Sequence, residues 1–379
     1  MIMKKIALIG STGSIGKQTL NVCRRHPDKF KIVSLAGGNN VGEFFEQVKE
    51  FSPKVASIKS EVDVSTLSKS TEFYFGEDAF TNAIIDEADI VVIALVGFKG
   101  IIAVLDAINK GKDVALANKE SLVVGGELVM RLAKEKGVKI LPIDSEHSAV
   151  WQALNFDFNK EFSKIILTAS GGAFRDLSIE QLSSVSAKDA LKHPNWDMGA
   201  KITIDCATLV NKAFEVIEAK WLYNTTFDKI DVIIHRESII HSMVEFKDKS
   251  VIAQMSYPSM ELPIALALSY PDRITSNINS LDFSVLKSLT FQPLDKLKYP
   301  CFDIVIQSAL TGGPYPAVAN GANEQCVKLF LEGRISYNDI YKGIYGALQS
   351  YDGGVHAHFE DLVIADKFAR EYVDKLFGV

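Results

Sequence analysis

The first 145 residues alternate apolar strand-like runs with helical patterns, and this alternation constrains the fold more than any other feature of the sequence. Parallel neighbouring strands need a crossover, usually a helix, so the pattern predicts an α/β fold with a Rossmann-like doubly wound parallel sheet covered on both faces. The predicted strands are Lys4–Ile9, Lys31–Ala36, Lys54–Ile58, Asp89–Leu95, Asp113–Ala117 and Val138–Ile143.

A glycine-rich turn, Gly10-Ser11-Thr12-Gly13-Ser14-Ile15-Gly16, joins the first strand to the first helix. Glycines allow a tight turn and close approach to a pyrophosphate, whose charge the helix N-terminus meets with N–H groups. The spacing G-x-x-G-x-x-G is a variant of the usual dinucleotide-binding fingerprint. We interpret the turn as a nucleotide site, and the alternative is a turn without a ligand. After the second strand, Gly37-Gly38-Asn39-Asn40 offers neither a carboxylate for a ribose 2′-hydroxyl nor a basic residue for a 2′-phosphate. This argues against a standard NAD site without establishing an NADP site.

Acidic residues follow the strand Val138–Ile143, in the stretch Asp144-Ser145-Glu146-His147. Carboxyl ends of parallel strands face the ligand crevice, and two carboxylates at i and i+2 can turn to one centre where the strand bends into a loop. Oxygen ligands of this kind suit Mg²⁺ or Mn²⁺. A helix start capped by Asp144 or Ser145 is the commoner interpretation of this stretch by itself.

Two further polar segments follow predicted strands. Asn118-Lys119-Glu120 comes after the strand that ends at Ala117, where it either contributes to the same crevice or simply begins a helix. The segment Thr168-Ala169-Ser170-Gly171-Gly172 follows a strand at Lys164–Leu167, and it is either a turn or a backbone anion site for a phosphate.

A helical run at residues 209–218 places Asn211, Lys212 and Glu215 on one face. Glu215 is the candidate third oxygen ligand beside Asp144 and Glu146, with a solvated Lys–Glu pair as the alternative. Upstream, Lys192 to Gly199 combines Pro, Gly and Trp196, which is typical of a closing lid or of an anchored surface loop.

Composition restricts the partners and the compartment. A formal charge of −6 and a pI of about 5.7 give no reason to expect nucleic acid or a membrane surface as a partner, and no apolar run reaches membrane-spanning length. Four distant cysteines indicate neither a disulfide framework nor a zinc site, and no signal peptide is recognised, so we expect a cytoplasmic protein.

The expected domains are a nucleotide-binding domain at 1–144 and an α+β catalytic domain at 145–269, with its flap near 192–199. A linker of low regularity at 270–300 and a small helical domain at 301–379 complete the chain.

The motifs G-S-T-G-S-I-G, A-N-K-E-S-L, L-P-I-D-S-E-H, S-G-G-x-F-R, H-P-N-W-x-M-G, N-K-x-x-E-x-I-E-A and A-N-E occur in this order along the chain. Together they resemble the 1-deoxy-D-xylulose 5-phosphate reductoisomerase family over its whole length. The resemblance implies a bacterial homodimer that uses NADPH and a divalent cation (Mg²⁺, Mn²⁺ or Co²⁺) to convert 1-deoxy-D-xylulose 5-phosphate to 2-C-methyl-D-erythritol 4-phosphate for isoprenoids.

The resemblance also implies roles for individual residues. The metal ligands are Asp144, Glu146 and Glu215, of which Glu146 and Glu215 also contact substrate. Lys119 and His193 contact substrate as well and are candidates for proton transfer. The flap carries Trp196. The other substrate positions are Ser145, Ser170, Cys206, Asn211 and Lys212. The NADPH positions are Thr12, Gly13, Ser14, Ile15, Gly38, Asn39, Asn40, Asn118, Glu120 and Gly199.

Two positions depart from the family's usual pattern. Lys or Arg commonly stands in place of Asn39, which implies a weaker preference for NADPH over NADH here. Ser commonly stands in place of Cys206, and a thiol is a poorer donor to phosphate. Two other functions remain as alternatives: a semialdehyde dehydrogenase with Cys206 as nucleophile, and a nucleotide-sensing regulator that needs no metal.

Overall fold

The structure is a computed structural model that describes residues 3–192, 195–196, 198–354 and 358–379. The chain forms two compact units. Unit 1 comprises Met1–Ser121, Val129–Ser145 and Ser259–Ile278, and unit 2 comprises Leu122–Leu128, Glu146–Pro258 and Asn279–Val379. Among the described residues, no helix combines the length and the apolar character that crossing a bilayer requires.

Unit 1 is built on a parallel sheet that has seven strands within the described residues, in the order β4-β3-β2-β1-β5-β6-β7. The predicted doubly wound sheet is therefore confirmed. Because β1 pairs with β2 on one side and with β5 on the other, the strand order reverses beside it, and the ligand crevice of such folds lies at this point. The strands are β1 (Lys4–Ile9), β2 (Phe30–Gly37), β3 (Val55–Ile58), β4 (Glu72–Phe75), β5 (Ile90–Ile93), β6 (Asp113–Leu116) and β7 (Ile140–Pro142).

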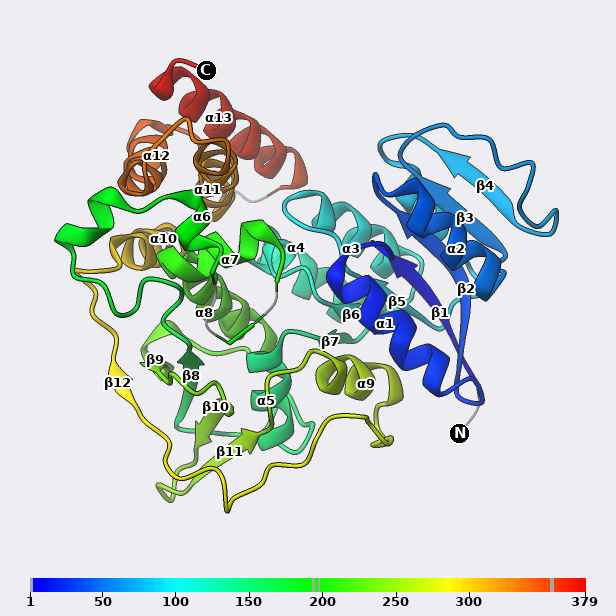
Figure 1. The fold of residues 1–379 in the computed structure, drawn as a ribbon, viewed down its shortest axis with the longest axis horizontal. Coiled ribbons are helices and arrows are strands. Elements are labelled where there is room, and N and C mark those ends of the chain that lie inside the picture. Colours follow the sequence, from blue (N-terminus) through cyan, green and yellow to red (C-terminus); the bar gives the residue numbers. More distant parts are fainter. Residues whose placement is uncertain (1–2, 193–194, 197, 355–357) are drawn as a thin grey trace. The chain divides into compact units, whose positions relative to one another are not determined.

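Except for the helix Glu261–Ser269, the helices of unit 1 connect these strands (Figure 1). Strands β1 and β5 form the core, since Ile6–Ile9 and Val91–Ile93 are fully buried between the helical layers. The amphipathic pattern did not identify α2, β4 or α9. The helical elements are α1 (Ser14–Arg25), α2 (Val41–Phe51), η1 (Ala79–Ala83), α3 (Lys99–Asn109), α4 (Glu120–Lys136, of which 122–128 belong to unit 2) and α9 (Glu261–Ser269).

Unit 2 contains a mixed sheet, with five strands among the described residues in the order β11-β10-β8-β9-β12. Strand β10 is antiparallel to β8 and β11, whereas β8 and β9 are parallel. The strands are β8 (Lys164–Ala169), β9 (Ile230–Ile234), β10 (Ile240–Glu245), β11 (Val251–Met255) and β12 (Gln292–Pro293).

The remaining elements of unit 2 are helical. Helices α11, α12 and α13 pack together at the C-terminal end of the chain (Figure 1). The elements are α5 (Ser145–Ala153), η2 (Glu180–Ser184), α6 (Ala187–Ala190), α7 (Ala200–Thr208), α8 (Val210–Leu222), η3 (Phe227–Lys229), α10 (Pro300–Thr311), α11 (Tyr315–Leu331), α12 (Tyr337–Ser350) and α13 (Phe359–Phe377).

The compact units differ from the domain boundaries expected from the sequence in three places. Helix α9, expected in the catalytic part, packs on α1 in unit 1. The C-terminal part is helical as predicted, yet it belongs to unit 2, because α10 packs directly on α8. The expected linker contributes strand β12, where Gln292 pairs with Ile234 of β9.

Candidate active site

The glycine turn after β1 brings the start of α1 against the neighbouring strand. Gly10 has φ of +95°, and a Cβ there would lie 2.5 Å from the carbonyl oxygen of Ala94. A Cβ on Gly16 would lie 2.2 Å from the Gly10 oxygen, so both positions require glycine. Gly13 precedes α1 without a side-chain cap, and Gly13 and Ser14 are exposed. The N-terminal amides of α1 are thus accessible to an anion.

The end of β2 lies beside this turn. The Gly38 amide donates to the Thr12 hydroxyl at 3.4 Å, and no atom lies within 4 Å of a Cβ built on Gly38. Asn40 caps α2, since its side chain accepts from the Glu43 amide at 3.2 Å. Asn39 is exposed. The open backbone around Gly13 and Gly38 fits a nucleotide at this edge of the sheet.

Asn118 holds two loops of unit 1 together. Its amide nitrogen donates to the oxygens of Leu95 and Gly97, both at 3.1 Å, and to Glu120 Oε2 at 2.9 Å. Lys119 forms an ion pair with Asp144 at 2.6 Å, so the segment Asn118-Lys119-Glu120 links the ends of β5, β6 and β7. Asn118 and Glu120 are buried, so their side chains are held in place at the ends of these strands.

Lys212 is the centre of a buried polar cluster in unit 2. Its ammonium lies 2.6 Å from Glu146 Oε1 of α5 and 2.5 Å from the Thr168 carbonyl oxygen of β8, and it also pairs with Glu215 of α8. Asn211 donates to the other Glu215 oxygen at 2.5 Å. Burial alone lowers the pKa of Lys212, but Glu146 and Glu215 outweigh this effect and raise the pKa above its ordinary value. The lysine therefore stays charged and offsets the repulsion between the two carboxylates.

Asp144 completes a group of three carboxylates. It stands where the chain passes from unit 1 to unit 2, two residues before Glu146, so the chain itself keeps it near the first turn of α5. One oxygen each of Asp144, Glu146 and Glu215 lie within 4.8 Å of one another. Helix α5 begins at Ser145, so this stretch is a helix start, as its local sequence suggested. The same stretch also brings the Asp144 and Glu146 carboxylates close to each other. An all-oxygen donor set fits Mg²⁺ or Mn²⁺.

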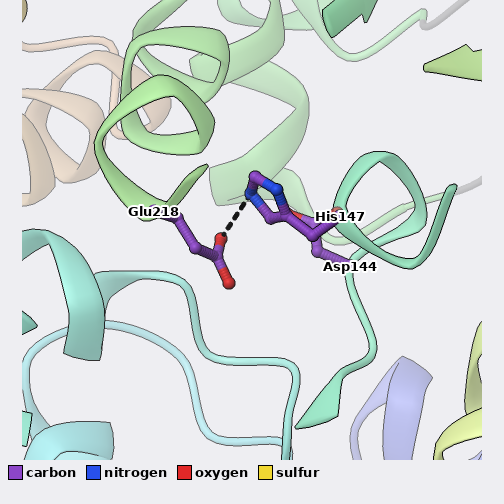
Figure 2. Close-up of side chains that lie close together, drawn as sticks. All are labelled: Asp144, His147 and Glu218. Carbon is purple, nitrogen blue, oxygen red and sulfur yellow. Dashed lines mark ion pairs between the residues drawn. The ribbon is translucent and has the colours of Figure 1, made fainter. Parts of the chain in front are cut away.

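A second pair joins the same two helices and was missed from the sequence. His147 Nε2 lies 3.1 Å from Glu218 Oε2, and both side chains are almost completely buried. Figure 2 shows this ion pair with Asp144 beside it, and ligand atoms of the three residues also lie within 4.8 Å of one another. Glu218 follows Glu215 by three positions, so the shared face of α8 was the available signal for this second pair.

The Ser170–Gly172 loop follows β8 and lies against the last turn of α7. The Ser170 oxygen accepts a bond of 3.0 Å from Arg175, and the Gly172 amide donates to the Ser170 hydroxyl at 3.3 Å. Cys206 is half-buried in the last turn of α7. The semialdehyde dehydrogenase alternative needs a nucleophilic cysteine directly after a strand. Cys206 does not meet this requirement, because it lies within a helix.

The expected flap is described in part. Asn195 donates to the Arg236 oxygen at 2.6 Å and to the Ser238 hydroxyl at 2.8 Å, and the Trp196 ring lies edge-on to His241, with the ring centroids 6.0 Å apart. Gly199 precedes α7 as its N-cap. His193 lies outside the described residues. The described part of the flap is therefore held at the β9–β10 connection.

Three family models match the chain. The model described as 1-deoxy-D-xylulose 5-phosphate reductoisomerase matches residues 6–126. The model of that enzyme's C-terminal domain matches residues 140–223, and the model described as the DXP reductoisomerase C-terminal domain matches residues 255–372.

Relatives match over nearly the whole length. The chain is 46% identical over 375 residues to the 1-deoxy-D-xylulose 5-phosphate reductoisomerase of Pelotomaculum thermopropionicum, with 97% of each chain covered. It is similar to the structure of that enzyme from Zymomonas mobilis in complex with NADPH, at 36% identity and a TM-score of 0.91, with 99% of each chain covered. A structure of DOX-P reductoisomerase with NADPH, fosmidomycin and magnesium gives 37% identity and a TM-score of 0.93, covering 99% of this chain and 98% of that one.

Proposed function

Because the chain belongs to the 1-deoxy-D-xylulose 5-phosphate reductoisomerase family, we propose that it isomerises and reduces 1-deoxy-D-xylulose 5-phosphate to 2-C-methyl-D-erythritol 4-phosphate. It is an NADPH-dependent oxidoreductase of non-mevalonate isoprenoid biosynthesis that uses a divalent cation. Within the chain itself, the main support for this proposal is the group of Asp144, Glu146 and Glu215. One carboxylate oxygen of each lies within 4.8 Å of the others, although Glu215 is distant in sequence.

The polar residues of the site suit the two halves of the reaction. Bound cation supplies Lewis-acid polarisation of a carbonyl oxygen, and bound NADPH supplies hydride. We assign Asp144, Glu146 and Glu215 to holding the cation. Lys212 and Asn211 orient Glu146 and Glu215, because they already bond to these carboxylates. Lys119, paired with Asp144, is positioned for proton transfer near the same carboxylates.

The substrate phosphate is assigned to Ser170 and the adjacent glycines, with Cys206, Asn211 and Lys212 on the neighbouring helices. Gly171 at φ +85° and Gly172 at φ +69° adopt a backbone conformation that glycine reaches without strain, and this turn holds the Ser170 hydroxyl, which accepts from the Gly172 amide. Binding energy from a phosphate held away from the reacting carbons can be used for orientation. Ser145 and Trp196 are assigned to the rest of the substrate, with residues 192–199 as the flap.

The nucleotide is assigned to residues 1–144. The accessible N-terminus of α1 supports the pyrophosphate assignment for Thr12 to Ile15, and the open backbone at Gly38 to Asn40 supports a place for the ribose. We also assign Asn118, Glu120 and Gly199 to the nucleotide. We also propose residues 145–269 as catalytic, 270–300 as linker and 301–379 as the helical domain.

We further propose a homodimer that works in the bacterial cytoplasm, with Mn²⁺ or Co²⁺ able to replace Mg²⁺. The dimer proposal is supported by β11, the edge strand of the unit 2 sheet, on which Val251 and Ile252 are about half exposed. Exposed strand edges with apolar side chains readily pair with another chain. The four free cysteines suit a reducing compartment.

The test is oxidation of NADPH by 1-deoxy-D-xylulose 5-phosphate, with and without a chelator. We expect turnover that stops on chelation and returns with Mg²⁺. Glu215→Gln should abolish turnover and weaken Mn²⁺ binding, measured directly by electron paramagnetic resonance. NADPH affinity should persist, because all residues assigned to the nucleotide except Gly199 lie in unit 1. The matched control is Glu332→Gln, at an exposed acid after α11. Chelator-insensitive turnover, or equal loss of NADPH and Mn²⁺ binding, would contradict the metal assignment.

A further inference from the structure

The Ser170–Gly172 loop and the end of α7 are packed backbone against backbone. A Cβ on Gly172 would lie 2.4 Å from the Cys206 oxygen and 2.8 Å from the Ala207 Cα, and both of these are main-chain atoms. No side chain separates the two segments at this point. A shift in the last turn of α7 must therefore move the loop, and the reverse also holds.

Two buried tyrosines from the C-terminal helical part donate hydrogen bonds to this assembly. The Tyr299 hydroxyl, just before α10, donates to the Gly171 oxygen at 3.1 Å. The Tyr337 hydroxyl, at the start of α12, donates to the Ala207 oxygen at 2.7 Å. The Tyr337 ring also packs edge-on against Phe174, two residues beyond the loop, at 5.2 Å between centroids. Each segment is thus held by a hydroxyl from a different part of the C-terminal region.

Both hydroxyls act as donors over a wide pH range. Tyr299 is 4% exposed and Tyr337 is 8% exposed. Burial raises the pKa of Tyr299 to about 12 and raises the pKa of Tyr337 well above its ordinary value. The Ala207 carbonyl oxygen lies in the last turn of α7, where carbonyl groups lack partners within the helix. A buried carbonyl without a hydrogen bond would destabilise the fold, and the Tyr337 hydroxyl supplies that bond.

These donors also orient the loop amides. Arg175 donates to the Ser170 oxygen and Tyr299 to the Gly171 oxygen. In a trans peptide the N–H points opposite to the C=O, so the amides of Gly171 and Gly172 face away from Arg175 and Tyr299. The Gly172 amide donates to the Ser170 hydroxyl at 3.3 Å, so the peptide that Tyr299 holds in turn holds the side chain proposed to bind the phosphate.

We propose that Tyr299 and Tyr337 are positioning residues for the substrate phosphate, which they serve by fixing the Ser170–Gly172 loop and the end of α7. This inference rests on the proposed function, in which that loop binds the phosphate. The C-terminal helices consequently contribute to substrate affinity without touching the substrate.

The test uses Tyr299→Phe and Tyr337→Phe, which keep the aromatic ring and remove only the donor. For each variant we expect KM for 1-deoxy-D-xylulose 5-phosphate to rise about three- to tenfold, as loss of one net hydrogen bond implies. The dissociation constant of inorganic phosphate should rise by the same factor, and kcat should change little. Because the tyrosines act at separate segments, each variant tests the inference independently if the other fails to fold.

Controls separate positioning from general destabilisation. Tyr345→Phe, on the exposed side of α12, should leave KM and phosphate affinity at their wild-type values. Mn²⁺ affinity and kcat/KM for the unphosphorylated ketose 1-deoxy-D-xylulose should be the same in wild type and in both variants. Equal losses for the two ketoses, or unchanged phosphate affinity in folded variants, would overturn the inference.

The two proposals fail in different ways. In one outcome, the wild-type protein binds inorganic phosphate and the tyrosine variants bind it more weakly, but the wild-type protein does not oxidise NADPH with the phosphorylated ketose. This outcome would support the loop inference and refute the proposed function. A wild-type protein that turns over substrate but shows no phosphate affinity would overturn the loop inference alone.

Discussion

Replacing Gly172 with alanine combines a backbone strain with a main-chain collision, and the two effects can be measured separately. Gly172 has φ of +69°, where an L residue costs about 1–2 kcal/mol, partly offset by about 0.4–1 kcal/mol from a less flexible unfolded chain. The added Cβ would also lie 2.4 Å from the Cys206 oxygen, about 1 Å closer than ordinary carbon–oxygen contacts. Overpacking of this kind costs about 1–3 kcal/mol, so we expect a total loss of about 2–4 kcal/mol.

Gly333→Ala is the matched control. Gly333 lies in unit 2 with φ of +72°, and no atom lies within 4 Å of its Cβ position, so only the backbone term of about 1 kcal/mol applies. All three tryptophans of the chain belong to unit 2, so fluorescence during urea unfolding follows this unit. Gly172→Ala should also raise KM for the phosphorylated substrate. Equal stability losses in the two variants, or a wild-type KM in Gly172→Ala, would refute the packing argument.

Three further outcomes are expected. A double-mutant cycle with His147→Gln and Glu218→Gln should give a coupling energy of about 1.5–3 kcal/mol in urea unfolding, as for a buried hydrogen bond to a charged group, and a value near zero would contradict the pairing. In the folded protein at mildly alkaline pH, a thiol reagent should modify Cys206 well before the three buried cysteines. Burial raises the pKa values of those three thiols, and only the thiolate form reacts with the reagent. Rapid modification of all four cysteines would contradict this prediction. Cys206→Ser should lower KM for the phosphorylated substrate because a hydroxyl donates better than a thiol, and an unchanged or higher KM would show that Cys206 does not serve the phosphate.

Local patterns predicted the elements whose burial follows from their own sequence. Strand β1 has the predicted bounds, and the glycine turn joins β1 to α1 as expected. Helix α2 and strand β4 were missed, and β4 lies at the sheet edge with half-exposed and exposed residues, where the apolar signal is weak. The packing of α9 on α1 and of α10 on α8 follows from no local pattern, because these partners are distant in sequence.

The sequence by itself determined which chemistry the chain carries. The spacing of Asp144 and Glu146 after a strand, and of Asn211, Lys212 and Glu215 on one helix face, indicated oxygen ligands and their companions, because periodicity sets how side chains point from their own element. Only the tertiary structure decided which elements meet. Lys212 reaches Glu146 across 66 positions of chain, and Tyr299 and Tyr337 reach the Ser170–Gly172 assembly across more than 120. Such contacts depend on how whole layers bury their apolar faces, and no local pattern records that choice.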